Sequence, residues 1–176
     1  MNDSMNELVI GQIEDRLIEC GIHRILICLE KLNDEQVLFR PNINSNSINN
    51  QILHLDGNVR QWLVSSLTDE QDFRNRDEEF DPENYNTKEE LIQMLHDLEK
   101  EVRKTFPYLK NIDLSKKKHV QCYHEPILSI IIHVIEHFSY HLGQITYITK
   151  MLLDIDTGYY AGMDLTKVNK VNKDHL

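Results

Sequence analysis

The segment from about residue 124 to about residue 153 is the most apolar part of the chain, and it constrains the fold most strongly. It contains one glycine, Gly143, and no proline after Pro126, so a long helix can form there. The run His124-Glu125-Pro126 is expected to open this helix, because proline suits the first turn and glutamate suits its positive end. The run Asp156-Thr157-Gly158 is expected to end it. A helix this apolar must be buried by others.

Three further helices are predicted, since only 6 Gly and 4 Pro interrupt the 176 residues. They span about 5–32, 48–67 and 87–106, and the last begins with capping-box spacing between Thr87 and Glu90. The first has an apolar stripe at helical spacing, made of Leu8, Ile13, Leu17, Cys20, Ile25, Cys28 and Leu32. We therefore predict an all-α four-helix bundle: one domain over 1–176, with the bundle at about 5–155 and a polar tail after about 163.

Two longer connections separate these helices. Residues 69–90 are acidic and poor in apolar side chains, which predicts a solvated loop rather than a metal site. Residues 108–123 form the second connection, with a short extended piece expected at 120–123.

The net charge of −10 argues against nucleic acid and against anionic membrane surfaces as partners. No run approaches the roughly 18 apolar residues that span a bilayer, and no signal peptide is expected at the N-terminus. Three scattered cysteines predict reduced thiols, of which Cys20 and Cys28 are expected to be buried. The expected compartment is the cytoplasm.

Three histidines share one face of the helix at 124–153. At about 100° per residue, His133, His137 and His141 follow one another at steps of about 40°. Gln144 lies within about 20° of His137 by the same count. This stripe is expected to face the bundle interior. Two histidines at i, i+4 can hold one metal ion, and the open alternative is a structural polar core.

A metal site needs a further ligand, and spacing alone does not identify it. His54 is a candidate on the helix at 48–67. Its face of that helix carries Asn58 and other polar residues, so His54 either lines a cavity or lies at the rim of the bundle.

Two segments resemble the DinB-like superfamily, which includes thiol-dependent S-transferases and mycothiol-dependent maleylpyruvate isomerases. They are Asn50-Gln51-Ile52-Leu53-His54-Leu55-Asp56-Gly57-Asn58 and His133 to Ile145, in which His137 and His141 precede Gly143-Gln144-Ile145. The resemblance covers most of residues 5–155. It implies an up-down-down-up bundle, commonly a homodimer, and a divalent ion, zinc or nickel, held by His54, His137 and His141. It leaves three roles open for His133: a hydrogen-bond donor to a metal-ligating residue, a substitute metal ligand or a core histidine.

Three neutral histidines leave a divalent ion with open positions, which is typical of catalytic sites. The expected function is a metal-dependent transferase that adds a low-molecular-weight thiol to a small electrophilic substrate. The alternatives are a metal-dependent hydrolase and a non-catalytic metal-binding module. Tyr140 is the candidate catalytic residue, as a proton donor or substrate contact, or else it packs with its hydroxyl in solvent. Asn58 and Gln144 are candidates to bond to a ligating ring or to metal-bound water.

Overall fold

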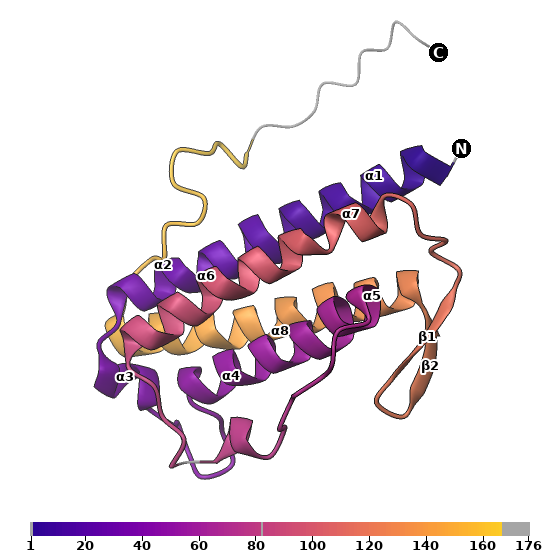
Figure 1. Cartoon of the computed structure of the whole chain (residues 1–176). Coiled ribbons are helices and arrows are strands. Elements are labelled where there is room, and N and C mark those ends of the chain that lie inside the picture. The colour runs from indigo at the N-terminus through magenta and orange to yellow at the C-terminus, as the bar shows by residue number, and fades with distance from the viewer. Residues whose placement is uncertain (1, 82, 167–176) are drawn as a thin grey trace, which may run out of the picture.

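The computed structural model describes residues 2–81 and 83–166. Figure 1 shows long helices lying side by side, with a β-hairpin at one end. The elements are α1 (Asn2–Gln12), η1 (Ile13–Ile22), α2 (His23–Lys31), α3 (Asp34–Leu38), α4 (Ile48–Val59), η2 (Arg60–Ser65), α5 (Ser66–Thr68), η3 (Glu78–Phe80), α6 (Lys88–Lys104), α7 (Phe106–Leu109), β1 (Lys117–Val120), β2 (Tyr123–Pro126) and α8 (Ile127–Leu153). The chain is mostly helical, as predicted. Of the predicted tail, residues 167–176 lie outside the described residues.

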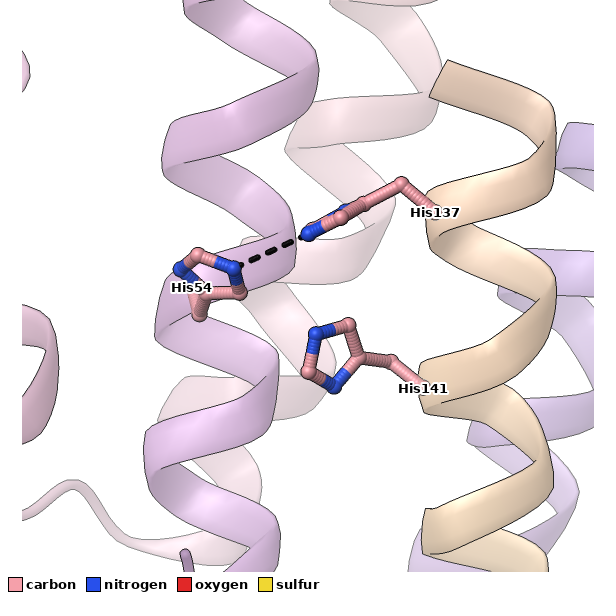
Figure 2. Close-up of side chains that lie close together, drawn as sticks. All are labelled: His54, His137 and His141. Carbon is pink, nitrogen blue, oxygen red and sulfur yellow. Dashed lines mark hydrogen bonds between the residues drawn. The ribbon is translucent and has the colours of Figure 1, made fainter. Parts of the chain in front are cut away.

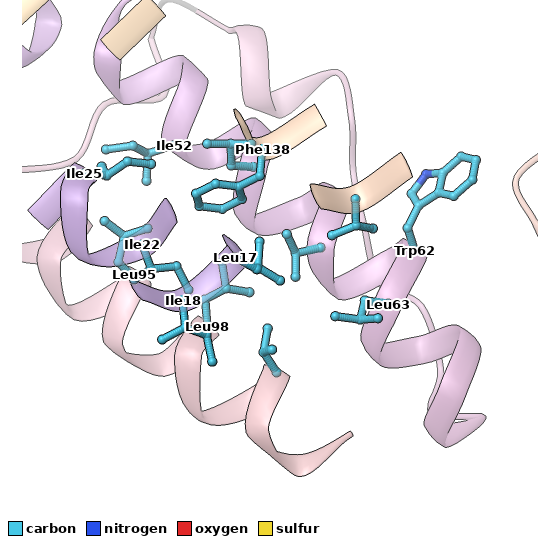
Figure 3. Close-up of a cluster of buried hydrophobic side chains, with 14 of the residues drawn as sticks. Leu17, Ile18, Ile22, Ile25, Ile52, Trp62, Leu63, Leu95, Leu98 and Phe138 are labelled. Atoms are coloured by element: carbon cyan, nitrogen blue, oxygen red, sulfur yellow. The ribbon is translucent and has the colours of Figure 1, made fainter. Parts of the chain in front are cut away.

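Long helical stretches form because η1 joins α1 to α2, and η2 joins α4 to α5, without an intervening loop. These two stretches, α6 and α8 contribute to one apolar core (Figure 3). Ile22, Leu95 and Phe138, from η1, α6 and α8, are almost completely buried. Truncating a core leucine such as Leu95 to alanine typically costs about 2–5 kcal/mol. The core therefore fixes the positions of α4 and α8 relative to each other.

The stripe predicted for the first helix is buried over most of its length. Ile13, Leu17, Ile25, Cys28 and Leu32 are buried, which confirms that part of the prediction. Leu8 is exposed, and Cys20 is only half-buried. Leu8 differs because no other described element covers that side of α1.

The third long helix begins as predicted. The Thr87 side chain accepts a hydrogen bond from the Glu90 backbone N–H, and the Glu90 carboxylate accepts one from the Thr87 N–H. Leu91, Leu95 and Leu98 then point into the core. The capping box was a reliable signal because it depends only on residues that are close in sequence.

The start of the last long helix was placed too early. His124, Glu125 and Pro126 belong to strand β2, which pairs with β1 in an antiparallel hairpin, and α8 begins at Ile127. The reason is local: a residue before proline is driven toward extended backbone, so Glu125 disfavours a helical turn. The expected extended piece at 120–123 is thus part of a larger hairpin, whose turn places Gln121 at a φ of 54°.

Helix α8 ends at Leu153, close to the predicted end. The residue that ends it is Asp154, in the left-handed conformation with a φ of 50°, and not the later glycine. Within the described residues, no helix is both long enough and apolar enough to cross a membrane.

Candidate metal centre

Three histidines from two helices meet at one side of the apolar core, with core residues before and after them along both helices. His54 comes from α4, and His137 and His141 come from successive turns of α8 (Figure 2). The ring centroids lie 4.9 Å apart for His54 and His137, 5.1 Å for His54 and His141, and 4.8 Å for His137 and His141. Each residue is 7% exposed. The structure thus brings together the three residues that the resemblance implies as ligands.

The position of the histidines on α8 explains why they lie at the border of the core. Counting about 100° per residue from His137, the buried residues Val134, Ile145 and Phe138 lie at about 60°, 80° and 100°. The buried arc is therefore centred well to one side of the histidine stripe. His137 lies at its edge and His141, at about 40°, lies inside it, whereas His133, Tyr140 and Gln144 fall beyond the edge, toward solvent.

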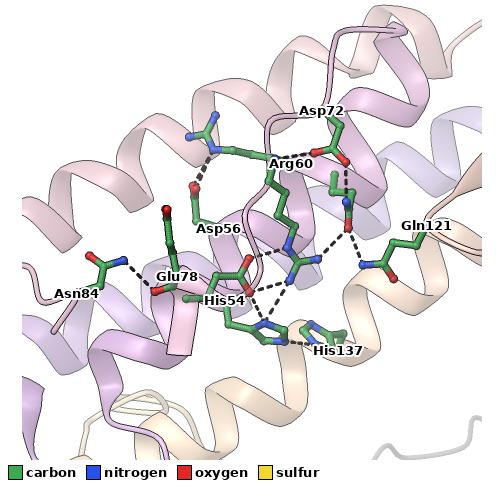
Figure 4. Close-up of polar contacts among 11 residues, drawn as sticks. His54, Asp56, Arg60, Asp72, Glu78, Asn84, Gln121 and His137 are labelled. Atoms are coloured by element: carbon green, nitrogen blue, oxygen red, sulfur yellow. Dashed lines mark hydrogen bonds and ion pairs between the residues drawn. The ribbon is translucent and has the colours of Figure 1, made fainter. Parts of the chain in front are cut away.

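The ion pair between Glu79 and Arg74 orients His54 (Figure 4). Its Nδ1 lies 2.8 Å from Glu79 Oε2. The same carboxylate accepts hydrogen bonds from Arg74 Nε at 2.6 Å and Arg74 Nη2 at 2.9 Å. Burial alone would raise the pKa of Glu79, but the hydrogen bonds from Arg74 and His54 outweigh it and lower that pKa. Glu79 is therefore an anion that accepts the Nδ1 proton of His54, which leaves the His54 Nε2 lone pair facing the other histidines.

The segment that carries Arg74 and Glu79 was predicted to be a solvated loop, and this prediction was wrong for its central part. Glu79 is buried in η3. The Asn50 side chain donates to the Glu79 carbonyl at 3.0 Å, which anchors η3 on α4. Gly57 allows the side chains of Glu79 and Arg74 to lie this close to α4. A Cβ at position 57 would meet Glu79 Oε1 and would lie 3.0 Å from Arg74 Nε. Sequence reasoning missed Glu79 and Arg74, because their distance along the chain from His54 leaves no periodic signal.

The remaining contacts fix the tautomers. His54 Nε2 lies 3.0 Å from His137 Nε2, so His137 donates its Nε2 proton to the His54 lone pair. His141 Nδ1 lies 3.4 Å from Gln51 Oε1 and donates to it, which frees the His141 Nε2 lone pair. Burial, reinforced by the other histidines, lowers the pKa of His137 to about 3. Burial and His54 lower the pKa of His141 to about 4. Both rings are neutral near pH 7.

These neutral rings fit a divalent cation. The candidate ligand atoms of His54, His137 and His141 all lie within 4.8 Å of one another. His54 Nε2 and His137 Nε2 already face each other, and a cation bound by both would take the place of the proton that they share. The Glu79 carboxylate behind His54 is the kind of partner that orients metal-ligating histidines and raises their basicity. Three buried histidines could therefore hold a metal ion here.

A pocket of about 470 Å³ opens beside the histidines. His54 and His137 form part of its wall, and Trp62, His133 and Tyr140 form an aromatic part. The His133 ring lies against the Trp62 ring at a tilt of 36°, with centroids 4.1 Å apart, and the Tyr140 ring meets His137 edge-on at 4.9 Å. A small molecule in this pocket would contact the histidine cluster directly.

The supporting residues expected from the sequence divide into two groups. His133, Tyr140 and Asn58 line the pocket. Tyr140 is half exposed, and burial of its remaining part raises the pKa of its hydroxyl, which stays protonated near neutral pH. The prediction that Gln144 bonds to a ligating ring or to metal-bound water is corrected. Its side chain is exposed, because it lies beyond the buried arc of α8. The amide beside His141 is that of Gln51, on α4.

Fold and site together define a mostly helical protein with a buried cluster of three histidines beside a pocket. Residues 22–160 match the model of a family described as "Protein of unknown function (DUF1572)", and the chain belongs to this family. No curated protein matches the chain.

Proposed function

We propose that the protein is a DinB-like, metal-dependent transferase that adds a low-molecular-weight thiol to a small electrophilic substrate. The DinB-like assignment, with its up-down-down-up helix order, is supported by His54 on α4 and the His137–His141 pair on α8. The observation that carries the proposed activity is the opening of the histidine cluster onto a pocket of about 470 Å³, which a closed structural metal site would lack.

In this proposal His54, His137 and His141 hold one divalent ion, zinc or nickel. Such an ion lowers the pKa of a bound thiol or water, which supplies a nucleophile near neutral pH. The chain does the remaining work. Glu79 holds the Nδ1 proton of His54, so that its Nε2 stays available. The aromatic wall would contact the electrophile, and Tyr140, whose ring lies 4.9 Å from that of His137 and whose hydroxyl is protonated, would donate a proton to the leaving group.

Thiol conjugation of monobromobimane or a chlorinated nitroaromatic tests this activity, with ester and amide hydrolysis assayed in parallel. We expect conjugation that depends on the metal and falls at least about 100-fold in His137→Ala, as for loss of a group that stabilises charge in the transition state. His96→Ala, an exposed histidine on α6, is the control and should retain full activity. Hydrolysis without conjugation would replace the transferase with a hydrolase. No turnover with several thiols would leave a non-catalytic metal-binding module.

We further propose that the protein is a homodimer. An apolar groove between the N-terminal helix and α8 is lined by Val9, Leu128, Ile131, Ile132 and Ile135. Arg16 and Glu136 lie at the same groove. Because a two-fold interface presents the same surface from both subunits, a groove that carries both charges is complementary to itself.

A further inference from the structure

Two side chains of opposite charge line the pocket beside the histidines without pairing with each other. They are Arg76, from the segment before η3, and Glu125, on β2. Within residues 2–81 and 83–166, neither makes a salt bridge. Lys118, which lies opposite Glu125 in the hairpin, instead pairs with Asp69 at 2.6 Å. Both charges are therefore available to a ligand.

The other arginine of the pocket has a different role. Arg74 is fully used by its own structure, since it donates to both oxygens of Glu79 and to Gln61 Oε1. Arg76 instead lies over the Phe80 ring, 5.2 Å from its centroid, and that ring lies 5.0 Å from the His54 ring. Arg76 thus presents an uncompensated positive charge at the end of the pocket that adjoins the histidines.

A third polar residue, Asn58, lies in the wall of the same pocket. Asn58 Oδ1 is buried and has no hydrogen-bond partner among the described residues. Asn58 lines the same pocket as Arg76 and Glu125. The oxygen itself is shielded from the pocket, so Asn58 contributes polar lining there while Arg76 and Glu125 provide the charges.

We propose that this pocket binds the zwitterionic head group of an α-amino acid, with the carboxylate at Arg76 and the ammonium at Glu125. Charge-assisted hydrogen bonds at both ends give such a ligand an advantage over molecules with a single charge. The inference rests on the proposed transferase function for its context, in which the thiol is the side chain of a cysteine-like molecule. Head-group binding itself needs only the residues named here.

The test uses four thioethers that share a methylthio group and differ in the polar groups that they carry. They are S-methyl-L-cysteine, which carries both groups, 2-(methylthio)ethylamine, 3-(methylthio)propionate and 2-(methylthio)ethanol, which carries neither. Their sulfur is blocked, so that binding does not require a metal–thiolate bond. Trp62 is the single tryptophan of the chain and lines the pocket, so its fluorescence reports binding to the full-length, zinc-loaded protein. We expect each charged group to tighten binding by about tenfold, as one charge-assisted hydrogen bond would.

Substitutions then assign each end of the ligand. Arg76→Gln should remove the advantage of the carboxylate compounds and leave that of the amine. Glu125→Gln should do the reverse. Lys110→Gln and Glu7→Gln make the same changes in net charge at exposed positions outside the pocket and should bind like the unmodified protein. Thermal melting of each variant checks that it is folded.

The outcomes separate this inference from the proposed function. Equal affinity for all four compounds in a protein that binds zinc would overturn the head-group inference alone. Equal losses for amine and carboxylate compounds in Arg76→Gln would also overturn it. Failure to bind zinc, with the head-group preference intact, would instead remove the metal-dependent function.

Discussion

His54 owes its orientation to residues outside its own helix. Its Nδ1 proton is held by Glu79, and Glu79 is held by Arg74. This arrangement keeps the His54 Nε2 lone pair directed at His137 and His141. At the scale of single residues, the availability of the cluster for a metal therefore depends on Glu79 as much as on the histidines.

Glu79→Gln is expected to weaken metal binding by about 10–100-fold, the usual effect of removing a carboxylate that supports a metal-ligating histidine. The amide removes the negative charge that favours the Nδ1 proton. Competition with a chromophoric chelator measures the affinity. Glu78→Gln, the exposed neighbouring position, is the matched control and should bind as tightly as the unmodified protein. Equal affinity of Glu79→Gln and Glu78→Gln would mean that Glu79 does not support His54.

Gly57→Ala is expected to weaken metal binding with little loss of stability. The new Cβ would meet the Glu79 carboxylate, which is the end of a flexible side chain and can move away from His54. Gly143→Ala is the control, because its Cβ would meet nothing within 4 Å in the middle of α8. That variant should keep its metal affinity and gain roughly 0.5–1 kcal/mol in the free energy of unfolding. Chelator competition measures the metal affinity of both variants, and urea denaturation measures their stability. Equal changes of both quantities in Gly57→Ala and Gly143→Ala would contradict the prediction.

The residues of the candidate site could be predicted only where local periodicity carries them. The i, i+4 spacing of His137 and His141 is a property of one helix, so the sequence was sufficient for that pair. The same count placed His133 and Gln144 equally well, because the spacing does not say where the buried arc is centred. His54 was identified as a candidate ligand of the site through the family resemblance. Glu79 and Arg74 had no signal, since their approach depends on how a loop folds back over Gly57.

At the scale of elements, the segment between α5 and α6 behaves as part of the site. Side chains at the start of α4 hold it: Asn49 Nδ2 donates to the Asn84 carbonyl at 2.9 Å, and Asn49 Oδ1 accepts from the Asn86 N–H at 3.0 Å. At its other end Gln61 accepts hydrogen bonds from Arg74 and from Gln121 in the hairpin turn (Figure 4). The segment thus connects α4, the hairpin and the histidine cluster.

Asn49→Ala is expected to loosen this segment while the helices stay intact. It removes hydrogen bonds that hold the backbone near Asn84 and Asn86, each worth about 0.5–1.5 kcal/mol. Hydrogen exchange measured by mass spectrometry should rise over residues 70–81 and 83–86 and stay unchanged in α6. Asn44→Ala, in the exposed loop before α4, is the control and should leave exchange in this segment unchanged. Unchanged exchange in Asn49→Ala would show that other contacts hold the segment.

Elements with local start signals were predictable, and those that depend on distant contacts were not. The Thr87 capping box marked the start of α6 correctly. The start of α8 was misplaced, because the proline at position 126 suits a first helical turn as well as the end of a strand. The hairpin and η3 have short, polar sequences, whose structure depends on packing against α8 and α4.

At the scale of the whole molecule, the apolar groove along α8 is the surface that most needs a partner. Ile132 is 55% exposed there, and Leu128 is 41% exposed. The proposed homodimer would bury both.

Ile132→Glu is expected to shift the protein from dimer to monomer, because the interface would then hold a buried charge without a partner. Sedimentation velocity measures the shift, and Tyr147→Glu, an exposed position on α8 outside the groove, should remain a dimer. A monomeric unmodified protein would contradict the proposal.

The proposed function depends on one divalent metal ion held by His54, His137 and His141. Elemental analysis of protein purified without an affinity histidine tag tests it most directly. We expect about one equivalent of zinc or nickel in the unmodified protein and in His96→Ala, as for a mononuclear three-histidine site. That metal should be lost in His54→Ala and in His137→Ala, with both variants still folded. Full occupancy in both variants, or no metal in the unmodified protein after loading with zinc and nickel, would contradict it.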